Sequence, residues 1–269
     1  MIEAKEVNFA YRRGEPVLND IECQIAAGEF VALLGHNGSG KTTLSRLFMA
    51  LVHPRSGQVC IDGQNIEKLE PADLVDKVGY VFQNPDLQIL GDTVYEEVAY
   101  GPRCKKLPAA QLEAQVLSAL AATGLSELAE IYPRSLSFGQ KRRLGVAAAL
   151  ALNPQILILD EITNGQDFLE KEQMMDYLQK INQEKGITII LITHDMNIAR
   201  RYAQRALVLQ AGNLVFDGPT VKLYDGSQEL TAWGLQQPVL AELATTFGVT
   251  ALTTEEFCAG MTLKGGGGK

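Results

Sequence analysis

Short runs of apolar residues with almost no alternation divide the middle of this 269-residue chain. They cover residues 30–34, 155–160 and 187–193. Runs of this kind are typical of parallel strands that are covered on both faces. A helical pattern follows each run, so the sequence predicts an open α/β sheet whose ligand lies at the carboxyl ends of the strands.

Other segments have a different periodicity. Residues 2–9, 17–25 and 58–61 are β-prone and separated by Gly, Asn and Asp turn signals, which predicts a small antiparallel sheet beside the first buried strand. Residues 109–122 place their leucines and Val116 on one helical face, and Pro108 stands near the start, where a missing N–H costs little. This pattern predicts a helix.

The end of the chain is less regular. After residue 220 the pattern becomes helical but uneven, so we expect residues 1–220 to form one domain and residues 221–264 a C-terminal extension. Residues 265–269 are four glycines and a lysine, a composition that predicts a flexible tail.

The loop after the first buried strand carries the clearest chemistry. It reads Gly35-His36-Asn37-Gly38-Ser39-Gly40-Lys41-Thr42, and Leu44, Leu47, Phe48 and Leu51 then recur at helical spacing. Glycines let a backbone turn tightly and aim its N–H groups at an anion, and the helix that follows adds its positive end. Lys41 would reach the β and γ phosphates of a nucleotide and the Thr42 hydroxyl would bind Mg²⁺. The alternative, a chance match, is weakened by the strand before the loop and the helix after it.

Composition and charge limit the classes of protein. The net charge is −8, which argues against nucleic acid as the main ligand, because neutralising phosphates takes a basic surface. The longest apolar stretches are about nine residues, far below the roughly 20 that span a bilayer, and the first residues lack a leader pattern. The four cysteines are scattered without metal-like spacing, which suits a reducing compartment. We therefore expect a chain that stays in the cytoplasm unless a partner tethers it.

Two further candidates follow the other buried strands. Asp160 and Glu161 end one strand, where an Asp would orient the Mg²⁺ shell and a Glu would take a proton from the attacking water. His194 follows the next strand. Each has a simpler reading, since acidic residues often end strands at solvated loops and a lone His is often a structural hydrogen-bonder. The functional interpretation of these residues therefore depends on the phosphate-binding loop at residues 35–42.

The segment Leu136-Ser137-Phe138-Gly139-Gln140 adds a further motif, 23 residues before Asp160. At this point the sequence resembles the ATP-binding cassette (ABC) ATPases over residues 1 to about 220. The resemblance implies a P-loop fold with a RecA-like α/β core, an antiparallel β subdomain and a helical subdomain, followed here by the small extension.

The resemblance also implies roles for individual residues, with ATP and Mg²⁺ as ligands. Glu161 would be the general base, His194 would hold the γ-phosphate and the water, and Gln83 would contact Mg²⁺ or the attacking water. Mg²⁺ would be bound by Thr42, Gln83 and Asp160. The nucleotide would be bound by Tyr11, which stacks on adenine, by Gly35, Asn37, Gly38, Ser39, Gly40, Lys41, Thr42 and Thr43, and by Ser137, Gly139, Gln140 and Asp167.

In the family two cassettes face each other head to tail. Ser137 and the Gly139 N–H of one subunit then close on the γ-phosphate held by Lys41 of the other. The resemblance therefore implies a second ABC ATPase subunit as a partner, in a homodimer or in a heterodimer with a paralogous cassette.

A narrower resemblance covers residues 80–103. The runs from Tyr80 to Gln88 and from Thr93 to Pro102 are similar to the cassettes of energy-coupling factor (ECF) and related cobalt or nickel importers. Such cassettes dock on an integral membrane T component, which holds a substrate-binding S component, at the cytoplasmic face of the cell membrane. Residues 84–103 are then the candidate contact surface, although Val94 and Val98 are expected to pack inside the helical subdomain. Trp233 and Phe257 belong to the extension, which such ATPases use for dimer contacts.

Two segments depart from the usual ABC pattern. Phe138 stands where most members have a second glycine, and residues 162–167 read Ile-Thr-Asn-Gly-Gln-Asp. These departures suggest that the two ATP sites of a dimer are not equivalent. Two other functions stay open: a soluble ABC ATPase acting on ribosomes or DNA, and a regulatory cassette that binds ATP without hydrolysis. A single P-loop without a heptad run argues against the first, and Glu161 with His194 argues against the second.

Overall fold

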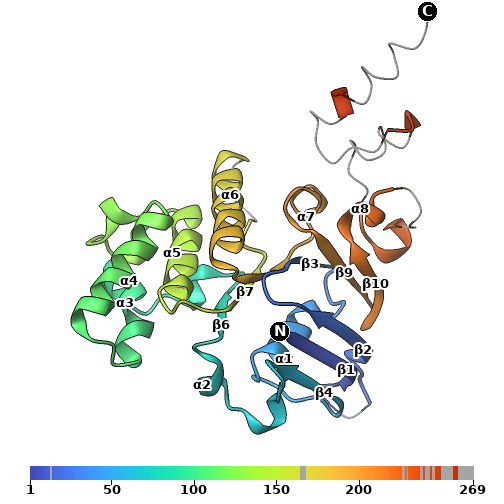
Figure 1. Cartoon of the computed structure of the whole chain (residues 1–269), viewed down its shortest axis with the longest axis horizontal. Coiled ribbons are helices and arrows are strands. Elements are labelled where there is room, and N and C mark those ends of the chain that lie inside the picture. Colours follow the sequence, from blue (N-terminus) through green and yellow to red (C-terminus); the bar gives the residue numbers. More distant parts are fainter. Residues whose placement is uncertain are drawn as a thin grey trace, which may run out of the picture.

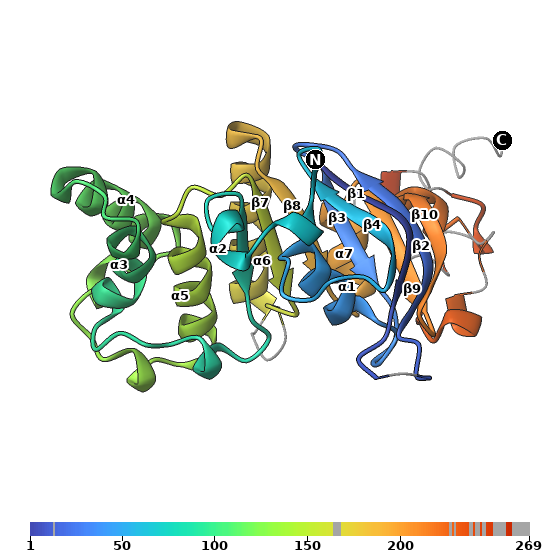
Figure 2. The same ribbon diagram turned by 90° about the horizontal axis from the view of Figure 1, so that it is seen from below.

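The structure is a computed structural model of the whole chain. It describes residues 1–12, 14–163, 168–225, 228, 230–236, 239, 243, 246–249 and 257–259. Three parts lie side by side in Figures 1 and 2: a central parallel sheet, an antiparallel sheet next to it, and a group of helices at the far side of the central sheet. Asp167 and residues 265–269 lie outside the described residues, so the predictions for them stay predictions.

The central sheet has six strands in the order β10-β9-β3-β8-β7-β6. All neighbouring pairs are parallel except β10 with β9. The first two buried strands that the sequence predicts are β3 (Phe30–Leu34) and β7 (Ile156–Asp160), and the third is β8 (Thr188–Ile192). Every residue of these three strands is buried. The predicted sheet is confirmed, including its lack of an exposed face.

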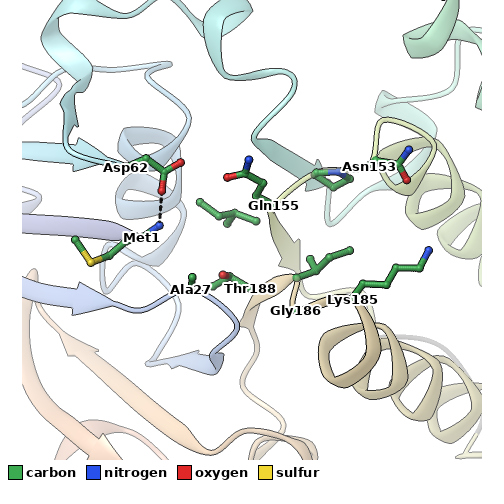
Figure 3. Close-up of a pocket in the computed structure, with 11 residues that line it drawn as sticks. Met1, Ala27, Asp62, Asn153, Gln155, Lys185, Gly186 and Thr188 are labelled. Atoms are coloured by element: carbon green, nitrogen blue, oxygen red, sulfur yellow. Dashed lines mark hydrogen bonds and ion pairs between the residues drawn. The ribbon is translucent and has the colours of Figure 1, made fainter.

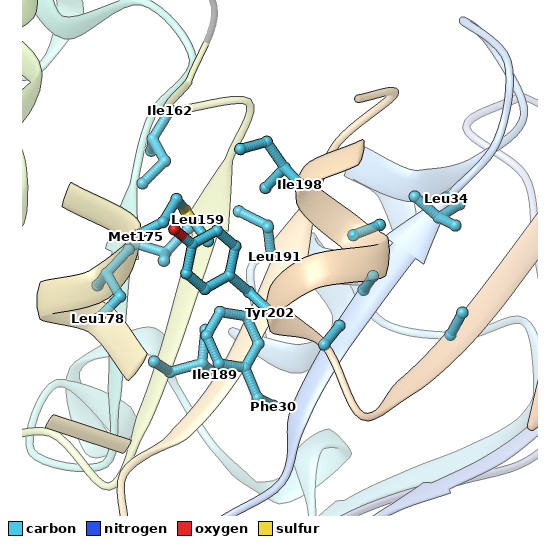
Figure 4. Close-up of a cluster of buried hydrophobic side chains, with 14 of the residues drawn as sticks. Phe30, Leu34, Leu159, Ile162, Met175, Leu178, Ile189, Leu191, Ile198 and Tyr202 are labelled. Carbon is cyan, nitrogen blue, oxygen red and sulfur yellow. The ribbon is translucent and has the colours of Figure 1, made fainter. Parts of the chain in front are cut away.

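Alternate residues of these strands enter two different cores. Phe30, Leu159 and Leu191 face the helices α6 (Phe168–Lys185) and α7 (Met196–Tyr202), as Figure 4 shows. Leu33 and Ile158, on the other face, pack with α1 (Lys41–Phe48) and with the antiparallel sheet. Burial on both faces explains why the strands read as continuous apolar runs.

The antiparallel sheet has the order β2-β1-β4-β5. Its main strands, β1 (Ile2–Phe9), β2 (Leu18–Ile25) and β4 (Ser56–Ile61), match the predicted segments closely. The predicted helix at 109–122 is α4 (Ala109–Ala122), which packs with α3 (Val94–Cys104) and α5 (Phe138–Leu150) around a third core. Val94 and Val98 are fully buried in that core, as expected.

The remaining elements connect these layers. The strands are β5 (Gln64–Asn65), β6 (Val78–Val81), β9 (Arg205–Gln210) and β10 (Asn213–Pro219), and the short α-helices are α2 (Pro71–Leu74) and α8 (Thr220–Leu223). Five single 3₁₀ turns are described: η1 (Ile66–Lys68), η2 (Pro85–Leu87), η3 (Ser126–Leu128), η4 (Pro133–Ser135) and η5 (Leu230–Trp233). No helix of the described residues combines the length and the apolar character that a membrane span requires.

The helix after the phosphate loop is shorter than its pattern predicts. Leu44, Leu47 and Phe48 are fully buried on one face, but α1 ends at Phe48 and Leu51 is half exposed. The prediction for Leu51 is wrong because Ala50 has a positive φ of 52°, which a helix does not continue through. Three of the four positions therefore carry the apolar face.

The first part of the predicted extension packs on the cassette. Leu223, Tyr224, Leu230 and Leu235 are buried and join the core beside α6 and α7. The hydroxyl of Tyr224 donates to the carbonyl of Met196, 2.8 Å away. In the part of the chain that is described, this segment covers the central domain.

Helix α4 offers a matched test of this packing. Leu120 is fully buried and Leu117 is half exposed on the same helix. We expect Leu120→Ala to lower the free energy of unfolding by about 2–5 kcal/mol, because it leaves a cavity, and Leu117→Ala to lower it by less than about 1 kcal/mol. Urea unfolding followed by circular dichroism measures both. Equal losses for the two variants would contradict the assigned burial.

Candidate functional site

The loop between β3 and α1 is held in shape by its glycines. Gly35, Gly38 and Gly40 all have positive φ, at 146°, 80° and 107°. A Cβ on Gly35 would lie 2.3 Å from the carbonyl oxygen of Leu209 on β9, and one on Gly40 would lie 2.7 Å from Leu18. These two glycines are therefore required by contact as well as by conformation. Around the Gly38 Cβ position, nothing lies within 4 Å.

Lys41 begins α1 and folds back over this loop. Its Nζ donates to the carbonyl oxygens of Gly35 at 2.7 Å and His36 at 3.0 Å. Burial lowers the pKa of the Lys41 ammonium, and the carboxylates of Glu161 and Asp160 act in the opposite direction. The cation thus lies at the concave side of the loop with two carboxylates close enough to affect its charge.

Asp160 ends β7 beside this cation. Its Oδ2 accepts a hydrogen bond from the Tyr80 hydroxyl at 2.8 Å. Burial raises the pKa of the Asp160 carboxyl, and the hydrogen bond from Tyr80 opposes that rise. Tyr80 lies on β6, the neighbouring parallel strand, so sheet pairing brings the two side chains together. Tyr80 therefore helps to keep Asp160 ionised.

Glu161 follows directly and has a strained backbone. Its φ is 49°, in the left-handed region, which costs about 1–3 kcal/mol for a residue other than glycine. Its N–H donates to the carbonyl of Ile192 on β8 at 2.9 Å, and its Oε1 lies 3.1 Å from Nδ1 of His194. The Glu161 side chain is buried and the His194 ring is 56% exposed. The structure thus brings the two predicted residues into direct contact.

Gln83 and the motif at 136–140 lie where the central sheet meets the group of helices: Gln83 follows β6, and the motif leads into α5. Gln83 is exposed just beyond β6, and its carbonyl accepts from Nη2 of Arg142 at 3.4 Å. Ser137 is the N-cap of α5: its Oγ accepts from the Gln140 N–H at 3.2 Å, and the Gln140 Oε1 accepts from the Ser137 N–H at 2.9 Å. This capping box fixes the loop in front of the helix. Gly139 is buried, and a Cβ there would lie 2.5 Å from Oε2 of Glu170 on α6.

Tyr11 lies along the side of α1, against Thr43 and Arg46. Its ring is half exposed, its hydroxyl is 3.3 Å from Oγ1 of Thr43, and it accepts from Nη1 of Arg46 at 2.9 Å. The ring of Phe9 packs edge-on against it, with centroids 4.9 Å apart. An exposed aromatic face at the edge of the phosphate loop is the arrangement that stacking on a base requires.

A cavity of ≈ 340 Å³ borders the loop on the side of His194. It is lined by Gly35, His36, Asn37, His194, Gly234, Leu235 and Gln236. Gly234 has a φ of +70°, and a Cβ there would lie 3.3 Å from the Cβ of His36. No local pattern predicts that residues 234–236 reach the loop, because this contact joins parts of the chain about 200 residues apart.

A larger cavity, of ≈ 420 Å³, lies at the opposite edge of the sheet, where β7 and β8 begin (Figure 3). Asp62 lies on its wall and accepts from the amino group of Met1, 2.6 Å away. None of the predicted site residues lines it. Size alone therefore does not locate the site, whereas the loop, the strand ends and the charged groups do.

The residues at the loop fit a nucleotide with Mg²⁺. Ser39 Oγ is buried without a hydrogen-bond partner in the described part of the chain, and the space around the Gly38 Cβ position is open, so the loop has both a polar group and room for an anion. Thr42, Asp160 and Gln83 supply the oxygen ligands that Mg²⁺ prefers. The donor set suits an anion beside a hard cation.

Comparison with known proteins identifies the family. Residues 18–164 match the sequence profile described as ABC transporter. The chain belongs to the ABC transporter ATP-binding family. The predicted fold is confirmed, as is the prediction of an ABC-type ATPase at the level of the family.

Individual relatives agree with this assignment. An ABC transporter ATP-binding protein of Geobacter sulfurreducens is 38% identical over 87% of this chain and 84% of its own length. One from Caldanaerobacter subterraneus is 39% identical over 95% of this chain but only 45% of its own length, and one from Methanosarcina mazei is 42% identical over 86% of this chain and 39% of its own length. This chain thus spans less than half of the length of these last two relatives.

Two solved structures are also similar. CbiO1 of Clostridium perfringens, described as part of the ABC transporter complex CbiONQ, has a TM-score of 0.79 and 34% identity over 90% of this chain and 97% of its own. The dimeric ATP-binding cassette MJ0796, solved with ADP and Pi, has a TM-score of 0.75 and 32% identity over 82% of this chain and 99% of its own.

The pair of Tyr80 and Asp160 gives a test that depends on pH. Removing the hydroxyl in Tyr80→Phe takes away the hydrogen bond that lowers the pKa of Asp160, so that pKa rises further. The protonated form then persists to higher pH, and the acidic limb of the pH profile for Mg²⁺-dependent ATP hydrolysis should move to higher pH. Tyr100→Phe, at an exposed tyrosine, is the control. An unchanged acidic limb in Tyr80→Phe would argue against this role.

Proposed function

We propose that this chain is the ATP-binding and ATP-hydrolysing subunit of an ECF-type importer, in which ATP-driven closure of two cassettes energises uptake of a vitamin or a transition metal ion. The observation that supports it most is the likeness to CbiO1, which extends over nine tenths of this chain. The motif-like runs at residues 80–103 point in the same direction.

The proposed reaction is hydrolysis of ATP at the carboxyl edge of the sheet. Lys41 and the loop N–H groups bind the β and γ phosphates, and Tyr11 stacks on the base. Thr42, Asp160 and Gln83 would hold Mg²⁺, which when bound neutralises charge on the phosphates. Asp160 ends β7 and Gln83 follows the neighbouring strand β6, while Lys41 and Thr42 begin α1, which supports a shared site.

Glu161 is the proposed general base. Its Oε1 lies 3.1 Å from Nδ1 of His194, so the ring restrains the position of the carboxylate. General-base catalysis contributes about 10²–10⁴-fold. The strained φ of Glu161, secured by its bond to Ile192, directs the side chain away from the path of the strand.

The site is one half of a composite. Ser137 is the N-cap of α5, which belongs to the group of helices and not to the part of the chain that carries the phosphate loop (Figure 1). A second cassette, identical or paralogous, would bring its own signature loop to Lys41. Phe138 and the unusual segment 162–167 support unequal sites in such a pair. The same proposal includes nucleotide binding by Asp167 and dimer contacts made by residues 221–264.

The proposed docking surface consists of residues 84–103. Phe82, an exposed aromatic residue, lies next to this segment in the sequence. Leu87, Leu90 and Tyr100 are 76%, 68% and 53% exposed there. Apolar side chains exposed together mark surfaces that bind partners. The partner would be the membrane T component, with its S component choosing the substrate, and the cassette would lie at the cytoplasmic face of the membrane.

Glu161→Gln tests the hydrolytic step. We expect the variant to bind ATP with the affinity of the parent and to release phosphate at least about 10²-fold more slowly, because the amide cannot accept the proton. Phosphate release and ATP binding measure the two effects. Glu113→Gln, at an exposed position of α4, is the control for loss of a carboxylate. Equal phosphate release by Glu161→Gln and parent would favour a different base or a non-hydrolysing cassette.

Co-purification tests the membrane partner. When the full chain is isolated with its native membrane fraction in a mild detergent, we expect integral membrane proteins to remain bound in a fixed ratio. Leu87→Asp with Leu90→Asp should release them while leaving ATP hydrolysis by the free chain intact, because charge opposes an apolar contact. Recovery with ribosomes or DNA instead would favour the soluble alternative.

A further inference from the structure

Arg142 is a residue that the proposed reaction does not use. It lies on α5 four residues after Phe138, so both side chains share one face of the helix. Its guanidinium carbon lies 4.6 Å from the centre of the Phe138 ring, a cation–π contact. The aromatic residue that replaces the usual glycine of the signature loop therefore holds a cation.

The guanidinium of Arg142 is buried but poorly paired. The residue is 3% exposed, and within the described ranges its Nε and Nη1 have no hydrogen-bond partner. Its Nη2 donates to the carbonyl of Gln83 over a long 3.4 Å. Burial lowers the pKa of Arg142, and the negative charge of Glu161 opposes this. Open donors on a buried cation indicate an arrangement that has room to change, because a better acceptor would stabilise it.

The same helix contacts the Gln83 segment at a second point. Nζ of Lys141 lies 2.9 Å from Oδ1 of Asp86, on the 3₁₀ turn η2 that follows Gln83. Two consecutive cationic residues of α5 thus contact the segment after β6. Arg142 contacts the backbone carbonyl of Gln83, and Lys141 contacts the carboxylate of Asp86. The start of α5 is thereby tied to the segment that carries Gln83.

We propose that Arg142 is a positioning residue that couples the two half-sites of one chain, because it joins the Phe138 signature loop to the Gln83 backbone. It rests on the proposed function, since the signature loop meets ATP only across a cassette pair. When Phe138 moves with the signature loop, the guanidinium changes its distance to Gln83 and to Glu161. The chain thereby senses the partner's nucleotide and adjusts the groups that face its own.

A purely structural role for Arg142 makes a different prediction. If the guanidinium only fills space between α5 and Gln83, its replacement lowers stability and activity together. If it transmits position, its replacement changes the rate of hydrolysis and the cooperativity between sites, and leaves nucleotide binding and stability nearly unchanged. The two roles are therefore distinguished by measurements other than activity alone.

The test compares Arg142→Gln, Arg142→Lys and Phe138→Leu in the full chain with any cassette that co-purifies with it. Binding is measured with a fluorescent ATP analogue, hydrolysis over a range of ATP concentrations, and stability by the thermal midpoint. Lys180→Gln removes an exposed cation from α6 and is the control. For Arg142→Gln we expect binding within about twofold of the parent, kcat lower by about tenfold and a Hill coefficient near 1.

The other variants sharpen the expectation. Arg142→Lys keeps the charge but loses the planar fork, so it should recover part of kcat and little of the cooperativity. Phe138→Leu removes the ring and leaves Arg142 in place, so the Hill coefficient should fall while kcat changes by less than about threefold. If Arg142→Gln does not fold, Phe138→Leu alone decides.

Several outcomes would overturn the proposal. They are a parental Hill coefficient in both Phe138→Leu and Arg142→Gln, a loss of kcat that follows a lowered thermal midpoint, or a parent that shows no cooperativity. Failure of the proposed function is recognised separately, because it appears in the parent as ATP binding without phosphate release. The comparison of variants is then not needed to reject that function.

Discussion

The close approach of the phosphate loop to β9 is the contact on which the site depends. At Gly35 the loop leaves β3 so near to Leu209 that a Cβ would lie 2.3 Å from its carbonyl oxygen. This approach is possible because β3 and β9 are neighbouring parallel strands. It turns the chain sharply enough for α1 to begin at Lys41, which then lies beside the ends of β7 and β8. A side chain at Gly35 would separate the cation from the carboxylates.

Parallel pairing brings the rest of the site to one edge. β6, β7 and β8 all run in the same direction as β3, so the residues that follow them meet there. Tyr80, Asp160 and the pair of Glu161 and His194 are therefore neighbours, although up to 114 residues separate them in the sequence. The edge where the same strands begin has a larger cavity but lacks these charged groups. Strand direction, more than pocket size, determines where chemistry is possible.

The sequence predicted what depends on local pattern. β3 and α4 were predicted to the residue, because apolar runs and helical spacing are read within a few turns. The sequence also placed Glu161 and His194 after buried strands, and the structure adds that the two side chains are in contact. The hydrogen bond of Tyr80, the cation–π contact of Arg142 and the contact of Gly234 with His36 were not predicted, because each depends on which distant elements pack together. The prediction that Leu51 belongs to the buried helix face is wrong for a local reason. The backbone turns at Ala50, and the apolar spacing does not reveal that turn.

One departure from the usual ABC pattern lies on α5, and the other directly precedes α6 in the sequence. Phe138 opens α5, and residues 162–167 lead into α6. Gly139 packs so closely against Glu170, three residues after that segment, that a Cβ would lie 2.5 Å from its Oε2. A change in one element therefore alters the surface that the other must fit. The substitution at Phe138 is therefore packed beside the start of α6, because its neighbour Gly139 leaves no room between the two helices.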